Sequence, residues 1–340
     1  MSAADARRYA EIIDGFPGCP IVVYGDLVAD EFVFGEFSRI SREAPVLILK
    51  HRESRILPGG AANAINNLIA LEAHPVPVGI LGRDDAGEEL HRQLRDSELS
   101  IPTIERDRDY TTPVKTRFVA GSAHSTRHQV LRLDREGRFR HTRKTEQAVW
   151  RRLAPLLGFC KGLIISDYGM GYVSPELVAR LAGMREEFPI TVDSRYQLLQ
   201  FPGLTASTPN EPEVEALLGY EIGNDRDRLE KAGRRLLRRL KSEAVLITRG
   251  RDGMVLFTPR KPSLSIPIFG SDQVADVTGA GDTVIAVFTL ALAAGASFEE
   301  ASRLSNYAGG LVVMKHGTAT VSRQELKEAV ARDRACSSHG

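Results

Sequence analysis

The sequence predicts an α/β fold with a mainly parallel central sheet, helices on both faces and a small additional β layer. Short apolar runs rich in β-branched residues recur along the chain, and segments with apolar residues at helical spacing separate most of them. Strands that are apolar along their whole length are typical of parallel sheets that helices cover on both sides. Two pairs of extended segments interrupt this alternation and predict the additional layer.

The elements can be placed in order along the chain. We expect strands at residues 21–26, 76–82, 163–167, 190–193 and 244–248, and helices at 61–73, 175–188 and 227–241. Residues 284–294 form the longest apolar stretch, which is well short of the about 20 residues of a membrane span and therefore predicts a buried helix. Ligands of parallel sheets bind outside the carboxyl ends of the strands, so the polar residues there predict one shared crevice. They are Asp26, Asp30, Asp167, Asp193, Asn210 and Thr248.

The interrupting segments are residues 31–37 with 45–52, and 111–120 with 127–134. We interpret them as a β lid over the crevice, and surface hairpins with no role are the alternative. The expected division is a main α/β domain of residues 1–30, 55–108 and 136–340, with a lid of residues 31–54 and 109–135 inserted in it.

The charge balance excludes several classes of partner. Lys and Arg number 45 against 44 acidic residues, a net charge of +1, so no overall field attracts nucleic acid or an anionic membrane. The basic run at 234–241 has leucines at helical spacing, which indicates the solvated face of an amphipathic helix.

The cysteines and the first residues indicate the compartment. Cys19, Cys160 and Cys336 are widely separated, which favours neither a disulfide framework nor a zinc site. Residues 1–20 lack the continuous apolar core of a signal peptide. We therefore expect a cytoplasmic protein.

The most informative segment is residues 276–282, DVTGAGD, which an apolar helix follows at once. Small residues at a helix start leave backbone N–H groups free to bind an anion, and the helix dipole adds to the attraction. Asp282, on the first turn, would lie beside a bound phosphate as a base for an attacking hydroxyl. Alternatively, the glycines only permit tight packing and Asp282 caps the helix.

Two further segments suggest a sugar site. Residues 57–63, LPGGAAN, form a glycine turn that opens a helix, and Asn63 offers sugar hydroxyls both a donor and an acceptor. A plain turn with a capping Asn is the alternative. In residues 25–30, GDLVAD, a carboxylate can accept hydrogen bonds from two neighbouring hydroxyls, or it can serve as a turn residue.

Together these motifs resemble the ribokinase-like (PfkB) carbohydrate kinase family. Residues 276–282 are similar to its C-terminal signature and residues 58–63 to its N-terminal one, within a match over about residues 20–325. Residues 38–45, 166–169 and 317–322 are most similar to the heptose 7-phosphate kinases of lipopolysaccharide precursor synthesis. The resemblance implies a ribokinase-like fold and an ATP-dependent kinase of a sugar or sugar-phosphate hydroxyl.

The resemblance also implies roles for the phosphoryl-transfer residues. Asp282 becomes the base, and the N–H groups of Gly279, Ala280 and Gly281 bind the transferred phosphoryl group. Residues 210–213 resemble an N-x-x-E element, in which Glu213 helps to hold Mg²⁺ through its water shell; a helix start capped by Asn210 fits the same pattern. The implied ATP ligands are Asn210, Thr248, Gly250, Gly253 and Asn306.

On the acceptor side the resemblance implies sugar ligands, and we extend it to the far end of the substrate. The sugar ligands are Asp30, Gly59, Gly60 and Asn63, and the far-end residues are Lys115, Asp167 and Arg195. Lys115 and Arg195 suit a substrate phosphate. Some relatives hold K⁺ near Asp276, and related kinases often pair two subunits through the lid, whose exposed strand edges favour a homodimer here.

Two positions depart from the heptose kinases. Met170 stands where they usually have Lys, and residues 193–195 read DSR instead of DPK. Because Lys and Arg are not equivalent donors, a fructose, fructose phosphate or ribose kinase is the alternative. The chain lacks an H-x-G-H segment, so we expect a kinase alone. The other hypotheses are a non-catalytic sugar or nucleotide sensor and, last, a dehydrogenase, which would need G-x-G-x-x-G after the first strand.

Overall fold

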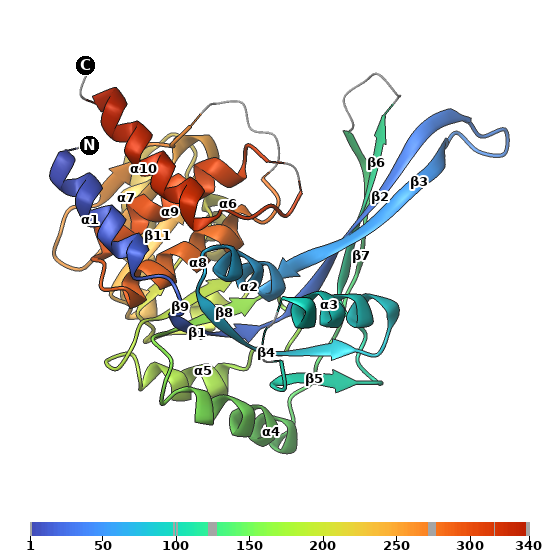
Figure 1. Cartoon of the computed structure of the whole chain (residues 1–340). Coiled ribbons are helices and arrows are strands. Elements are labelled where there is room, and N and C mark those ends of the chain that lie inside the picture. The colour runs from blue at the N-terminus through green and yellow to red at the C-terminus, as the bar shows by residue number, and fades with distance from the viewer. Residues whose placement is uncertain are drawn as a thin grey trace.

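The computed structural model describes residues 2–97, 99, 101–121, 128–270, 277–315 and 317–337 (Figure 1). The helices are α1 (Ala3–Asp14), α2 (Ala61–Ala70), α3 (Asp85–Asp96), α4 (Arg143–Leu153), α5 (Pro175–Ala182), α6 (Glu211–Leu218), α7 (Arg226–Leu240), α8 (Ala280–Ala293), α9 (Phe298–Val312) and α10 (Arg323–Ser337). The strands are β1 (Pro20–Gly25), β2 (Leu27–Ile40), β3 (Leu47–Gly60), β4 (His74–Gly82), β5 (Ile104–Asp107), β6 (Val114–Gly121), β7 (His128–Arg135), β8 (Gly162–Asp167), β9 (Ile190–Ser194), β10 (Ala206–Ser207), β11 (Ala244–Thr248), β12 (Met254–Phe257) and β13 (Leu264–Ile266).

The large sheet has nine strands in the order β13-β12-β11-β10-β9-β8-β1-β4-β5. From β11 to β5 every neighbouring pair is parallel, and β12 and β13 add antiparallel pairs at one edge. The predicted strands correspond to β1, β4, β8, β9 and β11. The helix expected at 175–188 ends earlier, at Ala182, where Gly183 forms the C-cap, because glycine is a weak helix former.

Helices cover both faces of this sheet, as predicted (Figure 1). On β1, Ile21 and Val23 point into a core shared with α1, α2, α3, α8, α9 and α10. Val22 and Tyr24 point the other way, into a core shared with α4, α5, α6 and α7. The central strands are therefore buried on both sides, which leaves their carboxyl ends as the place where polar groups gather.

Three helices begin at this carboxyl edge. Helix α2 has Gly60 (φ 56°) as its N-cap and α8 has Gly279 (φ 78°), and neither carries a side-chain cap. Helix α6 has a capping box, in which Asn210 and Glu213 each accept a hydrogen bond from the other's backbone N–H. The glycine starts of α2 and α8 bring bare backbone to the edge of the sheet.

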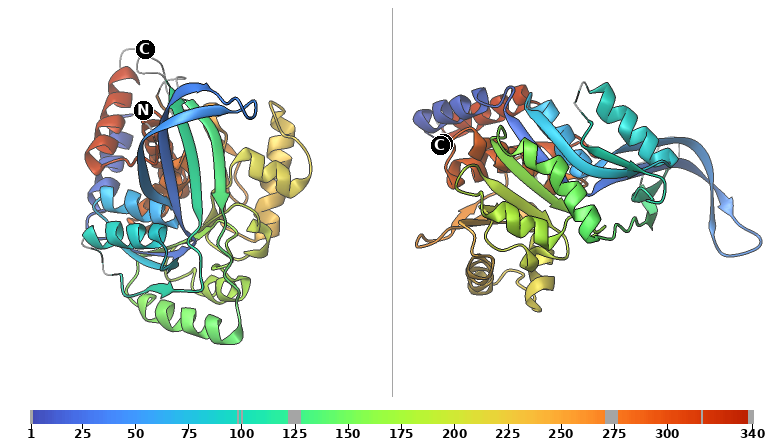
Figure 2. Two further views of the ribbon diagram at one scale, coloured as in Figure 1. Left: turned by 90° about the vertical axis from the view of Figure 1, so that its right-hand side faces the viewer. Right: turned by 90° about the horizontal axis from the view of Figure 1, so that it is seen from below.

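The small sheet has four strands in the order β3-β2-β6-β7 and projects from one end of the large sheet (Figures 1 and 2). Its strand β2 follows β1 after a single residue, Asp26. The β2–β3 hairpin includes the segments predicted at 31–37 and 45–52. Strands β6 and β7 cover most of the second pair: residues 111–113 precede β6, and Arg127 lies outside the described residues.

The two faces of the small sheet differ in polarity. In register, Asp30 lies opposite Lys115 and Lys115 opposite Asp134, and Arg117 lies opposite Arg132, so these charged residues share one face. The other face carries Leu131 and Leu133, which are 59% and 60% exposed. The charged face is the one that contacts the large domain, since the Lys115 ammonium lies over the ring of Tyr168, after β8.

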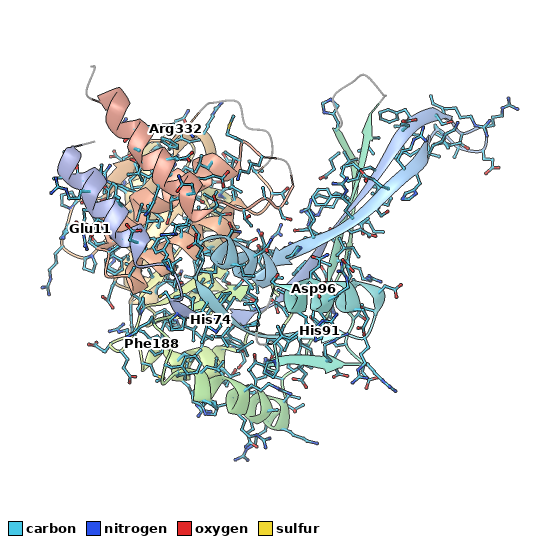
Figure 3. The ribbon with its side chains drawn as sticks, in the orientation of Figure 1. Glu11, His74, His91, Asp96, Phe188 and Arg332 are labelled. Carbon is cyan, nitrogen blue, oxygen red and sulfur yellow. The ribbon has the colours of Figure 1, made fainter. Side chains whose placement is uncertain are left out.

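The two ends of the described chain meet on one side. Helices α1 and α10 lie side by side, with Glu11 and Arg332 on that side of the molecule (Figures 1 and 3). Asp14 at the end of α1 pairs with Arg323 and Lys327 of α10. The thiols of Cys19 and Cys160 are buried and free. Among the described residues, no helix has the length and apolar character needed to cross a bilayer.

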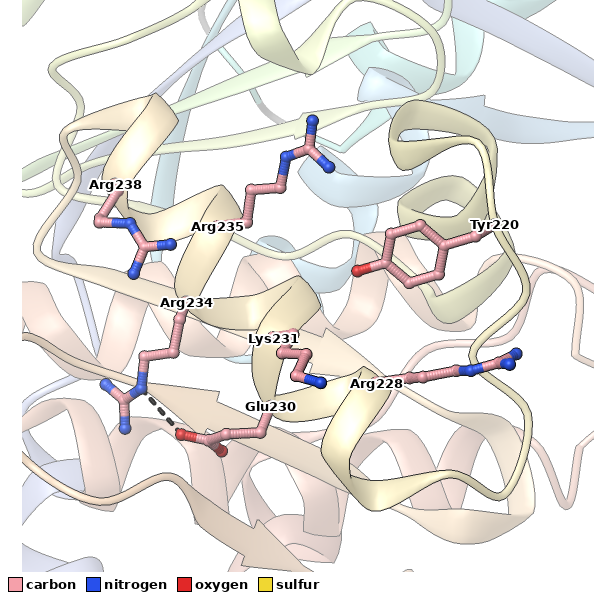
Figure 4. Close-up of a pocket in the computed structure, with 7 residues that line it drawn as sticks. All are labelled: Tyr220, Arg228, Glu230, Lys231, Arg234, Arg235 and Arg238. Carbon is pink, nitrogen blue, oxygen red and sulfur yellow. Dashed lines mark hydrogen bonds and ion pairs between the residues drawn. The ribbon is translucent and has the colours of Figure 1, made fainter.

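The basic run lies on α7, whose leucines are buried and whose Arg235 and Arg238 are exposed, as predicted. A cavity of about 560 Å³ opens between this helix and Tyr220 (Figure 4). The Arg234 guanidinium in this cavity donates hydrogen bonds to Glu230 at 2.8 Å and to the carbonyl oxygens of Thr258 and Lys261. The arrangement is that of a solvated amphipathic helix.

Candidate active site

Asp282 lies on the first turn of α8 and is 3% exposed. Its Oδ2 accepts a hydrogen bond from the Asn63 side-chain amide at 2.8 Å, and its Oδ1 accepts one from the Tyr168 hydroxyl at 2.8 Å. These donors come from α2 and from the loop after β8. Asp282 therefore does not cap its own helix; three separate segments converge on it.

A chain of hydrogen bonds supports this arrangement from behind. The Asn63 amide also donates to the carbonyl of Gly279 (3.3 Å), and the Asn67 amide donates to the carbonyl of Asn63 (2.9 Å). The Thr283 hydroxyl in turn donates to Oδ1 of Asn67 at 2.9 Å. The starts of α2 and α8 are thus held together by buried polar contacts, which are well ordered when every group has a partner.

The surroundings of Asp282 set its protonation. Burial raises the pKa of this carboxyl to about 6, and the Asn63 and Tyr168 donors oppose that shift. The nearby Asp30 carboxylate raises the pKa further, whereas the Lys115 ammonium lowers it. At neutral pH the group is a carboxylate with a pKa close to the working pH, which is what a general base requires.

A cavity of about 310 Å³ lies beside the α8 start, just before Asp282. All five residues expected at the nucleotide line it, together with part of the glycine motif: Asn210, Thr248, Gly250, Gly253, Asn306, Ala280 and Gly281. The Ala280 N–H closes a turn onto the carbonyl of Val277 at 3.2 Å. In the described part of the chain, no backbone carbonyl outside α8 accepts from the Gly281 N–H.

Two carboxylates lie close to residues that line this cavity. Glu213 keeps one oxygen in the capping box that it forms with Asn210. A Cβ built on Gly281 would lie 3.6 Å from Oδ2 of Asp193. Burial is the main cause of the raised pKa of both Asp193 and Glu213, and for Asp193 the carboxylates of Glu213, Asp282 and Asp167 add to it. Among the described residues no group of three or more His, Cys, Asp or Glu side chains is placed to hold a metal ion, so these carboxylates would supply only part of the oxygen shell of a divalent cation.

A smaller cavity of about 70 Å³ is lined by Tyr168, which bonds Asp282. Its charged lining residues are Lys115, Arg132, Arg135 and Arg195 with the acidic Asp134 and Glu136, and Met170 and Tyr196 also line it. The Lys115 ammonium lies 4.3 Å from the centroid of the Tyr168 ring. Burial lowers the pKa of Lys115, and Arg195 and Arg132 lower it further, whereas Asp30 and Asp282 raise it. Four basic residues thus face two acidic ones, and Arg132 pairs with Asp134.

The residues expected to bind the sugar lie beside this cavity. Asp30 is buried and forms an ion pair with Arg117 of β6. A Cβ on Gly59 would collide with the Asp30 carboxylate, and one on Gly60 would lie 3.2 Å from the Tyr168 ring. Glycine at both positions thus allows Asp30 and Tyr168 to approach the α2 start.

Two carboxylates from the expected crevice are buried in the loops. Asp167 accepts hydrogen bonds from the Ser194 hydroxyl (2.6 Å) and the Gly169 N–H (3.0 Å). Asp26 is fully buried and accepts from the N–H groups of Tyr168, Met170 and Tyr172. Their oxygens hold the chain after β8.

The sequence reasoning gave no role to Tyr168, Arg117 and Arg132, and none beyond the crevice to Asp193. Asp193 is the last residue but one of β9, so its place at the carboxyl edge was the available signal. The register of the small sheet is what brings Arg117 and Arg132 to the charged face, and no motif marks it. Asp276, the residue associated with K⁺, lies outside the described residues.

Known proteins share both the sequence and the fold. Residues 184–325 match the model of the pfkB family carbohydrate kinases. The chain is 38% identical to the bifunctional protein HldE of Desulfatibacillum aliphaticivorans over 92% of its own length. Residues 184–325 are thus similar to carbohydrate kinases of the pfkB family, in agreement with the motifs.

The chain is also 36% identical to the bifunctional protein HldE of Pseudomonas syringae pv. syringae, over 94% of the length of this chain. It spans 63% and 65% of the lengths of these two relatives. Arabidopsis thaliana ribokinase complexed with ribose and ATP aligns with a TM-score of 0.70 at 19% identity, over 92% of this chain and 99% of that one. Phosphofructokinase-2 from Escherichia coli in complex with potassium aligns with a TM-score of 0.74 at 18% identity, over 93% of this chain and 99% of that one. The ribokinase-like fold is thereby confirmed.

Replacing Gly279 by Ala should destabilise the protein and lower its rate of ADP release. Gly279 has φ 78°, and an added Cβ would collide with the Asn63 amide that bonds Asp282. A left-handed conformation alone costs about 1–2 kcal/mol, and the collision adds to it. The melting temperature and the rate of ADP release measure both effects.

Gly281→Ala is the matched control. Its φ is not positive, and the nearest atom to an added Cβ is 3.6 Å away. We expect a nearly unchanged melting temperature but a lower rate, because the methyl group enters the nucleotide cavity. Equal losses of stability in the two variants would contradict this view of the α8 start.

Proposed function

We propose that the protein transfers the γ-phosphoryl group of ATP to a hydroxyl of a sugar phosphate, with D-glycero-β-D-manno-heptose 7-phosphate as the preferred acceptor and its 1-hydroxyl as the nucleophile. The observation that carries the proposal is the place of Asp282: it follows Gly281, which lines the cavity of the nucleotide motifs, and it bonds Tyr168, which lines the cavity that contains Lys115 and Arg195. The acceptor is taken from the resemblance of residues 38–45, 166–169 and 317–322 to heptose 7-phosphate kinases, and the similarity to the HldE proteins supports it. The product would then serve ADP-heptose and lipopolysaccharide precursor synthesis.

In this proposal ATP occupies the 310 Å³ cavity with its phosphates at the α8 start. The N–H groups of Gly279, Ala280 and Gly281 and the helix dipole stabilise the charge of the transferred group. The Ala280 N–H must leave Val277 to take part. Glu213 and Asp193 would hold Mg²⁺, which neutralises phosphate charge when bound. The K⁺ expected near Asp276 stays a prediction.

The proton follows a short path. The acceptor hydroxyl gives its proton to the Asp282 carboxylate as its oxygen forms a bond to the γ-phosphorus, and the bond from that phosphorus to ADP breaks. Asp282 ends the step as a neutral acid and returns the proton to solvent. Asp30, Gly59, Gly60 and Asn63 would orient the sugar, with Asp167 acting behind them through the loop that it holds.

The existing phosphate of the acceptor would lie in the cationic cavity. Among the described residues neither Arg195 nor Lys115 forms an ion pair, and both line that cavity, Arg195 just after β9 and Lys115 on β6. Charge-assisted hydrogen bonds to a phosphate are the strong ones, and guanidinium groups bind it through two N–H groups. Met170 lines the same cavity, so its difference from the usual Lys falls at the acceptor phosphate.

The first test is ADP release with Mg²⁺ over a panel of acceptors. The panel contains the heptose 7-phosphate, fructose 1-phosphate, fructose 6-phosphate, fructose and ribose. We expect turnover of the heptose phosphate, and a loss of about 10²- to 10⁴-fold in kcat for Asp282→Asn with a retained fold. Full activity of that variant would refute the assignment of Asp282 as the base.

The other outcomes of the panel are equally definite. Turnover of another sugar alone would keep the kinase mechanism and replace the acceptor. No turnover on any acceptor, together with binding of ATP, would favour the non-catalytic sensor.

A second prediction concerns Arg195. Arg195→Gln should raise the KM for the phosphorylated acceptor by about 10- to 100-fold, because a charge-assisted contact to its phosphate is lost. The KM for ATP should change little. Arg238→Gln, on the exposed face of α7, is the control and should change neither constant. An unchanged acceptor KM in the Arg195 variant would place the phosphate elsewhere.

We also propose that residues 31–54 and 109–135 act as a lid on the α/β domain, and that two copies of the chain pair through it. Three features support this proposal. The small sheet presents its charged face to the site, and its opposite face bears Leu131 and Leu133. Phe37, Ile40 and Leu47 on the long hairpin are also exposed, and apolar surface of this kind favours burial against a second copy.

The double variant Leu131→Glu and Leu133→Glu should be monomeric, because four buried charges would face one another across the paired sheets. Light scattering after size exclusion measures the mass. Phe159→Glu is the control: Phe159 is 50% exposed but lies outside the small sheet, so the dimer should persist. A monomeric unaltered protein, or a dimer that survives the double variant, would refute pairing through this face.

A further inference from the structure

Tyr168 has no part in the proposed reaction, yet its hydroxyl lies at the centre of the site. It donates to Oδ1 of Asp282 at 2.8 Å, while the Asn63 amide donates to Oδ2 at the same distance. Each oxygen of the carboxylate therefore has one fixed donor. A carboxylate oxygen has two lone-pair sites, so each keeps one for another partner.

The position of Tyr168 is strongly determined by its neighbours. Its N–H donates to Asp26 at 2.8 Å, and the next two alternate residues, Met170 and Tyr172, donate to the same carboxylate at 3.1 and 3.3 Å. One edge of the ring lies against Gly60, where any Cβ would come within 3.2 Å. The hydrogen bond of the Tyr168 backbone and the packing of its ring against Gly60 thus fix the position of its hydroxyl.

The Lys115 ammonium contributes from the small sheet. It lies 4.3 Å from the centroid of the Tyr168 ring, a favourable cation–π distance. A cation over the ring withdraws electron density from the phenol, which makes the O–H a better donor. The pKa of Tyr168 is raised, first by burial and then by Asp282, so the phenol keeps its proton at neutral pH and acts only as a donor to the carboxylate.

We propose that Tyr168 is a positioning residue for the base: together with Asn63 it clamps the two oxygens of Asp282, so that one free lone pair faces the acceptor hydroxyl. This inference rests on the proposed function, since it takes Asp282 as the base. The clamp joins α2, α8 and the loop after β8 at one carboxylate. Removing one donor frees the carboxylate to rotate about its Cβ–Cγ bond.

The clamp has a second consequence for the charge on Asp282. The groups that face it are Asp30 of β2, Lys115 of β6, Tyr168 and, across the cavity edge, Asp193 of β9. Both donors stabilise the charged form and oppose the effect of burial. The substitution Tyr168→Phe would remove the hydroxyl donor and so raise the pKa of Asp282. The charges of Asp30, Lys115 and Asp193 would stay in place.

The test compares Tyr168→Phe with Tyr220→Phe. Tyr220 lines the cavity beside α7, outside the proposed site (Figure 4). For Tyr168→Phe we expect kcat to fall by about 10- to 100-fold with the KM for ATP within about twofold. The acid limb of kcat/KM, at about pH 6 in the unaltered enzyme, should move up by about one unit. Tyr220→Phe should match the unaltered enzyme.

A measurement without turnover separates this inference from the proposed function. The ¹³Cγ signal of Asp282, identified by its absence in Asp282→Asn, reports ionisation in labelled protein. Its midpoint should be about 6 and should rise in Tyr168→Phe. Unchanged midpoint and kcat in that variant would overturn the clamp even if Asp282→Asn is inactive. An active Asp282→Asn would overturn the proposed base, and the clamp with it.

Discussion

A single buried carboxylate, Asp282, organises the structure. An ion removed from water has to be compensated by donors in place, and here they come from α2 and from the loop after β8. That requirement explains why Asn63 is buried and why Gly60 and Gly279 are glycines: a side chain at either position would occupy the space that the donors need. Elements distant in sequence are thereby held in one geometry.

The charged residues on the two sides of this carboxylate have opposite signs. Asp193 and Glu213 make the nucleotide side acidic, while Lys115, Arg132 and Arg195 make the other side basic. The division suits a reaction in which a metal-bound nucleotide meets an anionic acceptor. With a net charge of only +1 on the chain, this polarity is local, built from strand ends and loops rather than from overall composition.

Much of this could be predicted from the sequence. The apolar runs predicted β1, β8 and β11, and the glycine motifs predicted residues that the fold gathers around one cavity. The short strands β10 and β13 carry too few residues for a periodicity to appear. Tyr168 and Arg117 could not be predicted, because their contacts depend on loop conformation and on the register between two strands far apart in the chain. Asn63 was predicted as a sugar ligand, but only the structure shows its amide bound to Asp282.

The junction of β1 and β2 at Asp26 has an evolutionary consequence. On one side of this residue lie the strands that carry the nucleotide motifs, and on the other lies the sheet that carries Asp30, Lys115, Arg117 and Arg132. Under the proposed function, part of the acceptor site therefore lies on a separate structural unit from the nucleotide motifs, while Asn63 and Arg195 lie on the large domain. Substitutions in the small sheet would then change the choice of acceptor and leave the nucleotide motifs unaltered, which would let one scaffold diversify its substrates.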